Sequence, residues 1–408
     1  MKKIKFSLVL QNPFYLLLSI YLLANIYSIF ILLSGSMLKV DSEEFIYSEY
    51  IILISACAIF FSFLLLFIFY RVANRPKLVK FELSFSSRWG RLLALIQISY
   101  VIYNYYYGIN IAGVEDKSQG NEGFNALFML LQPDILYLLI ATGLKSDRLF
   151  WINSIIFIIS SFMRAWLGAP ILLLVLLMTR RSTGQINIKK VILIFILLVL
   201  GALLLPLAVS VKWFLRSGGG FEEGFDFLLN IGYFKYLFES FDYVANRFQL
   251  FGHVALLATN SESMAVAYEA NKFIPYWMDG APQSMFYKMM GADAFQLNKY
   301  MVRSLFGSNN LVYATNPGLA GWLFVLQSKS VFFISYLIFI ALILPRYVLK
   351  HAGLKYFSMI MCFTLIYLFH GWIAAYFNLM LYLLFFIFVR RVASYHMKSK
   401  IRNKYKLS

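Results

Sequence analysis

The sequence predicts an all-α, polytopic integral membrane protein. Of its 408 residues, 61% are hydrophobic and only 14% are charged, whereas a soluble globular chain is about half apolar and about a quarter charged. Apolar runs long enough to cross a bilayer recur along the chain, and the alternating segments of a membrane β-barrel do not occur. We therefore expect one transmembrane domain over residues 1–408, with about 10–12 membrane-crossing helices.

Lysine and arginine in the short loops set the expected orientation. The first apolar stretch, 14–33, is too long for a signal-peptide core and no small-residue cleavage site follows it, so we expect a retained span after a cytoplasmic N-terminus. An acidic, external loop leads to a second span over 51–70. Six basic residues between 71 and 91 then mark a cytoplasmic loop, followed by spans over 92–111 and 124–143.

Two apolar segments are expected to form short helical hairpins, because each lies between two basic, cytoplasmic loops. Residues 149–178 contain one ionisable side chain, Arg164. As a single helix they would be about 45 Å long, against a hydrocarbon core of about 30 Å. One crossing cannot join two loops on the same side, so we expect a turn near Arg164. The same argument predicts a second hairpin over 356–389 that turns near 370–376 and leads to a cytoplasmic C-terminus.

A large external loop is expected over 212–315, after a span over 191–211. It carries eight Lys or Arg and nine Asp or Glu, and this lack of excess positive charge agrees with an external position. A connection of this length is predicted to be functional, with amphipathic helices at the membrane surface. The chain then re-enters over 316–344, where Lys329 indicates a short re-entrant piece followed by a span.

Several function classes are disfavoured by the sequence. The two cysteines, Cys57 and Cys362, lie in apolar runs and form no zinc or disulfide pattern. The net charge of +18 lies in loops between spans, which argues against nucleic-acid binding. There is no Walker motif, no dinucleotide fingerprint and no Asp-x-Asp. We expect no metal, no cofactor and no nucleic-acid partner.

Several separate cations are expected on the external face. Arg164 lies at the first hairpin turn, and Lys212, Arg216, Arg247 and Arg303 belong to the large loop. Separate arginines suit an anionic, multidentate ligand such as a diphosphate. Each also has a structural interpretation: interfacial anchors for the first three, and surface ion pairs for the last two.

A general base toward a sugar hydroxyl is sought among the external histidines and carboxylates. His253 and Asp242 are the candidates that we name, although a packed core histidine is the commoner outcome for the apolar surroundings of His253. His370 lies at the second hairpin turn, and Asp279 lies in IPYWMDGAPQS. The residues alone leave this choice open, and other acids precede Arg247 as well: Glu222, Glu223, Asp226 and Glu239.

The layout resembles the bacterial O-antigen polymerase family of inner-membrane proteins. Three features carry the resemblance: a lone arginine at a hairpin turn in SSFMRAWLGAPILLLVLL, an Asn-Arg helix in ANRFQLFGHVALL, and the path out of the loop through FIPYWMDGAPQS and TNPGLAGWLFVL. The layout covers nearly the whole chain. The family's paired loops, each with an arginine and a glycine at a set spacing, are not found in this sequence.

The resemblance implies a membrane-embedded glycosyltransferase, without a metal or a nucleotide-sugar donor. Such polymerases work on the periplasmic side and move a growing glycan from undecaprenyl diphosphate onto the non-reducing end of a new repeat unit. Arginines hold the diphosphate in this family; Arg164 and Arg247 match best, and Arg216 and Arg303 match by location. The resemblance also implies a chain-length regulator and a flippase as partners.

Two alternatives stay open. An O-antigen ligase would transfer the glycan to a lipid A core, but His253 is not followed by the glycine-rich segment of the ligases. A flippase or transporter of lipid-linked oligosaccharide is the other alternative. Transporters usually place charges along an internal cavity and lack an external insertion of this length.

Overall fold

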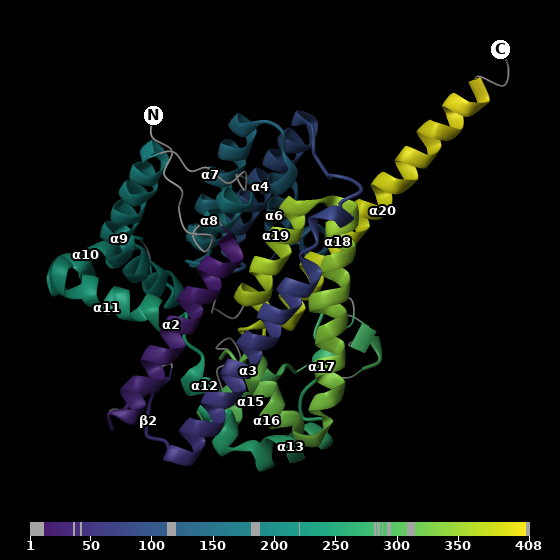
Figure 1. Cartoon of the computed structure of the whole chain (residues 1–408). Helices are drawn as coiled ribbons and strands as arrows, with labels where there is room; N and C mark the ends of the chain where they lie inside the picture. The colour runs from purple at the N-terminus through teal and green to yellow at the C-terminus, as the bar shows by residue number, and fades with distance from the viewer. Residues whose placement is uncertain are drawn as a thin grey trace.

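The computed structural model describes most of the chain. Regular secondary structure in this part is helical except for one antiparallel hairpin, in which β1 (Leu38–Val40) pairs with β2 (Glu43–Phe45). The predicted all-α class is confirmed for these residues, whose helices form one bundle with α20 projecting beyond it (Figure 1). The described residues are 12–35, 37–40, 43–111, 120–180, 188–219, 221–280, 283, 286–287, 289–291, 295–307 and 315–404.

Five helices or runs of helices in the described part are long and apolar enough to cross a membrane. This number is below the 10–12 expected. The hairpin arms are short, α4 (Ser87–Tyr107) is too polar to be counted, and the predicted span over 191–211 begins in a part of α9 (Ile188–Arg216) whose side chains lie outside the described residues. The shorter apolar helices are Ala169–Arg180 and Leu354–Leu368. The five candidates are Pro13–Leu33, Glu49–Ala73, Glu122–Gly143, Gly318–Ala352 and Ile373–Ala393.

Some of the sequence-based expectations fall outside the described residues. They concern the chain ends 1–11 and 405–408, the loop segments 112–119 and 181–187, and parts of the large loop at 220, 281–282, 284–285, 288, 292–294 and 308–314. The charges of these segments contribute to the expected orientation, which therefore stays a prediction.

The first two spans are the helices α2 (Pro13–Leu33) and α3 (Glu49–Ala73), as predicted. They lie side by side, and Phe14 stacks on Tyr70 with 4.2 Å between the ring centroids. Asn12 caps α2, because its side chain accepts a hydrogen bond from the Phe14 N–H at 3.1 Å. A 3-10 turn, η1 (Pro76–Leu78), lies between α3 and α4.

The predicted span over 124–143 consists of two helices. α5 (Glu122–Leu131) ends at Gln132, whose φ is +42°, and α6 (Pro133–Gly143) begins at the proline that follows. The ring of a proline clashes with the preceding residue and disfavours the helical conformation there. Proline also lacks the N–H that would continue the hydrogen bonds of the helix. The break therefore follows from Pro133.

The first short hairpin is confirmed. α7 (Asp147–Met163) leads to a turn at Arg164, and α8 (Ala169–Arg180) returns. The turn is closed by the Trp166 N–H, which donates to the Ser161 carbonyl at 2.9 Å, and Ala165 has a φ of +54°. Gly168 and Pro170 flank the start of α8, as expected of turn residues.

The second short hairpin is confirmed as well. α19 (Leu354–Phe363) continues as the π-helical segment η5 (Thr364–Leu368), and α20 (Ile373–Lys404) returns after a turn. The Trp372 N–H donates to the Tyr367 carbonyl at 2.8 Å, and Gly371 has a φ of +81°. Both hairpins thus turn where the charge pattern predicts.

The segment predicted to be re-entrant contains α16 (Gly318–Leu326), which begins against the turn of the second hairpin. The Gly318 N–H donates to the His370 carbonyl at 3.2 Å. α16 ends at a sharp break, η3 (Gln327–Lys329), where Lys329 is exposed and paired with Glu269. Lys329 therefore marks a surface break. A continuous run of helix follows through α17 (Ser330–Ile338), η4 (Phe339–Ile343) and α18 (Leu344–Ala352).

The expected large loop starts inside a helix, because α9 (Ile188–Arg216) extends beyond residue 212. α10 (Phe221–Ile231) and α11 (Tyr233–Ala245) pack back on α9 (Figure 1) and enclose a small core. The outer face of α11 exposes Phe234 and Phe238. Their amphipathic character agrees with the prediction. The small core consists of Val209, Leu228 and Tyr236.

The middle of the same stretch belongs to the core of the bundle. Every residue of α12 (Phe251–Thr259) except Thr259 is buried, and the helix packs on α3 and α16. It is followed by α13 (Ser261–Glu269), the 3-10 turn η2 (Tyr276–Met278) and α15 (Leu297–Leu305). Because α12 is apolar and buried, this part of the chain packs inside the bundle and does not lie on its surface.

Candidate functional site

A cavity of about 660 Å³ lies where the turns of the two short hairpins meet α9 and the end of α11. We call it the cationic cavity. The first hairpin contributes Trp166 and Leu167, and the second contributes His370 and Trp372. The cationic side chains come from the other two elements, and they are Lys212 and Arg216 of α9 and Arg247 beyond α11.

The lining combines two arginines and a lysine with aromatic rings. Burial, together with the charges of Arg216 and Arg247, lowers the pKa of Lys212 to about 6, so that near neutral pH its ammonium form is favoured by a bound anion. Lys212 is 3% exposed; its ammonium donates a hydrogen bond to the Tyr243 hydroxyl and lies 4.5 Å from the centre of the Trp213 ring. The Arg247 guanidinium lies 5.0 Å from the centre of the Tyr243 ring. Such cation–π contacts hold cations while leaving their remaining donors available.

No Asp or Glu occurs among the described residues that line the cationic cavity. Like charges that are crowded in a partly desolvated site repel one another. A bound anion relieves this repulsion and gains charge-assisted hydrogen bonds from the guanidinium groups. The lining of the cavity is therefore chemically suited to an anionic ligand.

The local sequence explains how these side chains come together. Lys212 and Arg216 are four residues apart on α9 and so share one face of the helix. Arg216 also donates to the Ala165 carbonyl at 3.4 Å, which links α9 to the first hairpin turn. His370 donates from Nε2 to the Arg247 carbonyl at 2.9 Å. The backbone at Arg247 is thereby fixed to the second hairpin turn.

The structure thus brings Lys212, Arg216 and Arg247 together, but it places Arg164 elsewhere. The Arg164 guanidinium makes a bidentate ion pair with Asp134, at 2.8 and 2.9 Å, and lies 3.4 Å from the Tyr100 hydroxyl. Its side chain extends from the turn toward the start of α6, away from the cationic cavity. A charge in an apolar segment usually finds such a partner. The sequence contained a signal for this ion pair, because Asp134 is the one carboxylate in the predicted span over 124–143.

The other named candidates do not line the cationic cavity. Arg303 is exposed on α15, Asp242 is exposed on α11, and His253 is buried within α12. The position of His253 is that of a packed core histidine. Trp166 and Trp372 are site residues that the sequence reasoning did not name, although each lies at a predicted hairpin turn.

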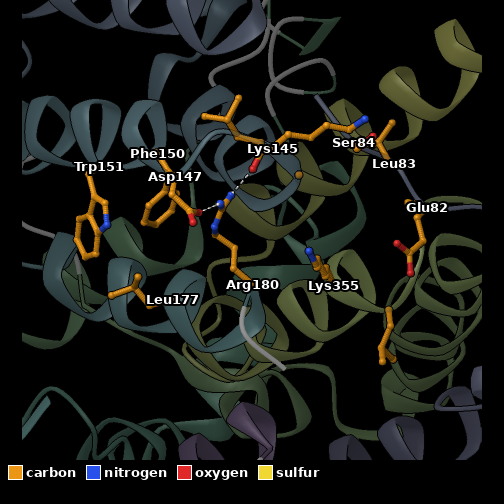
Figure 2. A pocket seen from close by; sticks show the side chains of 14 residues that line it. Glu82, Leu83, Ser84, Lys145, Asp147, Phe150, Trp151, Leu177, Arg180 and Lys355 are labelled. Carbon is orange, nitrogen blue, oxygen red and sulfur yellow. Dashed lines mark hydrogen bonds and ion pairs between the residues drawn. The ribbon is translucent and has the colours of Figure 1, made fainter. Parts of the chain in front are cut away.

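A second polar cavity, of about 450 Å³, lies at the junction of α6, α7, α8 and α19 (Figure 2). Its central cation, Arg180, donates to the carbonyl groups of Ala141 and Leu144 and pairs with Asp147 at 2.8 Å. Phe150 covers the guanidinium, with 4.3 Å from Cζ to the ring centre. These contacts use three hydrogen bonds of Arg180 within the fold and give it a structural role at this junction.

Comparisons of the chain with protein-family models, with curated proteins and with solved structures each found no match. The interpretation of the site therefore depends on its own geometry and chemistry. The observations that count are the position of the cationic cavity between two hairpin turns, its three cations, and its aromatic lining.

Proposed function

We propose that this protein is a membrane-embedded glycosyltransferase that polymerises lipid-linked oligosaccharide repeat units. The cationic cavity would hold the diphosphate of an undecaprenyl-diphosphate-linked donor, on the periplasmic side of a bacterial inner membrane. The single observation that carries the proposal is the convergence of Lys212, Arg216 and Arg247 on one cavity whose described lining contains no acid.

The chemistry of glycosyl transfer from a lipid diphosphate accounts for this arrangement. The bond between the anomeric carbon and the diphosphate oxygen breaks, and negative charge grows on the leaving group. Preorganised guanidinium and ammonium groups stabilise that charge without reorganising. Because guanidinium groups bind phosphate oxygens in a bidentate manner, Arg216 and Arg247 also orient the donor.

The surroundings of the cavity suit the rest of the donor. Tryptophan rings at both hairpin turns, Trp166 and Trp372, offer flat apolar faces on which sugar rings can stack. The five candidate spans give the bundle a lipid-facing surface for the polyprenyl tail. A site at the hairpin turns would therefore keep the tail in lipid and the sugars in the cavity.

The proposal is tested by the surface glycan of cells that carry variants of the cationic cavity. Arg216→Ala and Arg247→Ala each remove a donor to the leaving group, which typically costs about 10²–10³-fold in rate. We expect lipopolysaccharide capped with single repeat units in place of the long ladder. Arg303→Ala is the matched control, because Arg303 is an exposed arginine outside the cavity.

Full-length ladders from both cavity variants would refute the diphosphate site. Complete absence of a cap in a deletion strain would instead favour a ligase or a flippase. The sidedness is tested separately with Arg303→Cys in a background lacking Cys57 and Cys362. A membrane-impermeant maleimide should label it from the periplasm, and labelling only from the cytoplasm would refute the orientation.

A further inference from the structure

A smaller cavity, of about 190 Å³, adjoins the cationic cavity on the other side of Trp372, whose side chain lines both. The Trp372 indole N–H donates to the Asn316 side-chain oxygen at 2.8 Å, which holds the ring in place where the two cavities adjoin. Asn316 lines the cationic cavity, and the next residue, Pro317, lines the smaller one. The two cavities are therefore neighbours in the fold.

Asp279 is the one acid among the described residues that line either cavity. One of its carboxylate oxygens accepts a hydrogen bond from the Gln296 side-chain amide at 2.8 Å. The Ala374 backbone N–H, at the start of α20, also donates to this carboxylate. These contacts hold the carboxylate in place at the wall of the smaller cavity.

We propose that the smaller cavity receives the terminal sugar of the acceptor repeat unit and that Asp279 is the general base for its hydroxyl. This inference rests on the proposed function and deepens it, because it assigns the acceptor subsite and the second half of the reaction. The donor diphosphate would lie in the cationic cavity, and the two substrates would meet beside Trp372, which lines both cavities.

In the proposed transfer step, the smaller cavity accepts the proton of the acceptor hydroxyl and the cationic cavity holds the diphosphate leaving group. The acceptor hydroxyl gives its proton to the Asp279 carboxylate, and its oxygen forms the new bond to the anomeric carbon of the donor sugar. The bond from that carbon to the diphosphate oxygen breaks, and the electron pair leaves with the polyprenyl diphosphate. The proton on Asp279 is then lost to water, which returns the carboxylate.

A general base in this reaction has to be kept apart from the cations that bind the diphosphate. An arginine in direct contact with a carboxylate would lower its basicity, and the carboxylate would compete with the diphosphate for the cation. No Lys or Arg occurs among the described residues that line the smaller cavity. Burial raises the pKa of Asp279, while the hydrogen bonds from Gln296 and Ala374 partly oppose this rise. A raised pKa brings a carboxylate closer to the ideal for a base near neutral pH.

The contact with Ala374 also gives Asp279 a structural role, as a cap on α20. Asparagine caps a helix about as well as aspartate, since it offers the same side-chain oxygen, but it is not a base. Asp279→Asn therefore separates the two roles. The matched control is Asp242→Asn, which changes an exposed carboxylate on α11 outside both cavities.

The experiment uses the full chain in lipid nanodiscs with synthetic undecaprenyl-diphosphate-linked repeat units as donor and acceptor. For Asp279→Asn we expect transfer to fall about 10²–10⁴-fold, the usual contribution of a general base. Donor binding and the midpoint of thermal unfolding should match the wild type. Asp242→Asn should transfer at the wild-type rate.

A second variant provides a readout that does not depend on removing the carboxylate. Gln296→Leu removes a hydrogen bond that favours the charged form, so the pKa of Asp279 rises further. Since the base acts when it is deprotonated, the acidic limb of the rate profile should move to higher pH.

The results separate this inference from the function on which it rests. If the wild type transfers and Asp279→Asn transfers equally well, or if the Gln296→Leu profile is unshifted, the assignment of the base is overturned and the diphosphate site stands. If Asp279→Asn unfolds early, the pH profile of Gln296→Leu decides. If the wild type neither binds the donor nor transfers, the proposed function itself fails.

Discussion

Breaking the ion pair between Arg164 and Asp134 should destabilise the protein strongly, and the loss of stability should depend on which of the two residues is replaced. The Arg164 side chain is 11% exposed and that of Asp134 is 31% exposed. Removal of one partner of a buried pair costs about 3–5 kcal/mol, because the other charge stays buried. Asp134→Leu leaves the more buried charge with only the Ser160 carbonyl at 3.2 Å and the Tyr100 hydroxyl at 3.4 Å. We expect a loss in this range for Asp134→Leu.

Arg164→Leu should cost less, about 1–3 kcal/mol, which is the penalty of an unsatisfied polar group. The reason is that the remaining carboxylate is partly exposed and can be solvated. The double variant removes both charges, and apolar replacement of a whole buried pair is often neutral. We expect it to be more stable than Asp134→Leu alone, with a favourable coupling energy in the double-mutant cycle.

The assay is thermal unfolding of the purified protein together with polymer formation by the same samples. Equal or additive losses of stability would refute the buried-pair interpretation. The double variant also distinguishes the position of Arg164 in the structure from the role that the sequence predicts for it. If that variant is stable and forms polymer, Arg164 is a structural residue. If it is stable and forms no polymer, the pair acts on the substrate through at least one of its two members, and the purely structural reasoning from the ion pair is wrong.

Two further variants test the second hairpin turn. His370→Ala removes the hydrogen bond to the Arg247 carbonyl, worth about 0.5–1.5 kcal/mol, so KM for the lipid-linked donor should rise several-fold. His370→Gln keeps an N–H donor and should restore part of the donor affinity. An unchanged KM in both variants would contradict the role of His370 in positioning Arg247. Gly371→Ala should lower the unfolding midpoint, because its φ is +81° and a Cβ would come within 2.9 Å of the Pro317 side chain. Gly232 has a φ of +95° and no heavy atom within 4 Å of an added Cβ. Gly232→Ala should therefore cost only the backbone strain of about 1–2 kcal/mol and should lower the unfolding midpoint less than Gly371→Ala. Equal effects of the two glycine variants would exclude the steric contribution.

Local features of the sequence predicted the two short hairpins with their turns. Residues 149–178 are too long for one crossing and lie between two basic loops, and the chain turns at Arg164 as this requires. The break after α16 was predicted from Lys329, which interrupts the apolar run. By contrast, the helical break at Gln132 was missed, although Pro133 after it is a strong local signal.

The residues of the site were predicted less completely than the spans. The charge and position of Lys212, Arg216 and Arg247 made them candidates, but Arg303 had the same local features and lies outside the cavity. Local sequence does not say which face of a helix meets another segment. Asp279 illustrates the same limit, because nothing in its neighbourhood distinguished it from Asp242 until the start of α20 was seen beside it.

The sequence by itself determined the helical class, the hairpins and the list of charged residues that a membrane protein has to accommodate. These are consequences of local hydrophobicity and of charge in the loops, which act over one span at a time. Only the tertiary structure decided that Arg164 pairs with Asp134 while three other cations share one cavity. That decision depends on packing between segments far apart in the chain, because a buried charge is stabilised by whichever partner the fold brings to it.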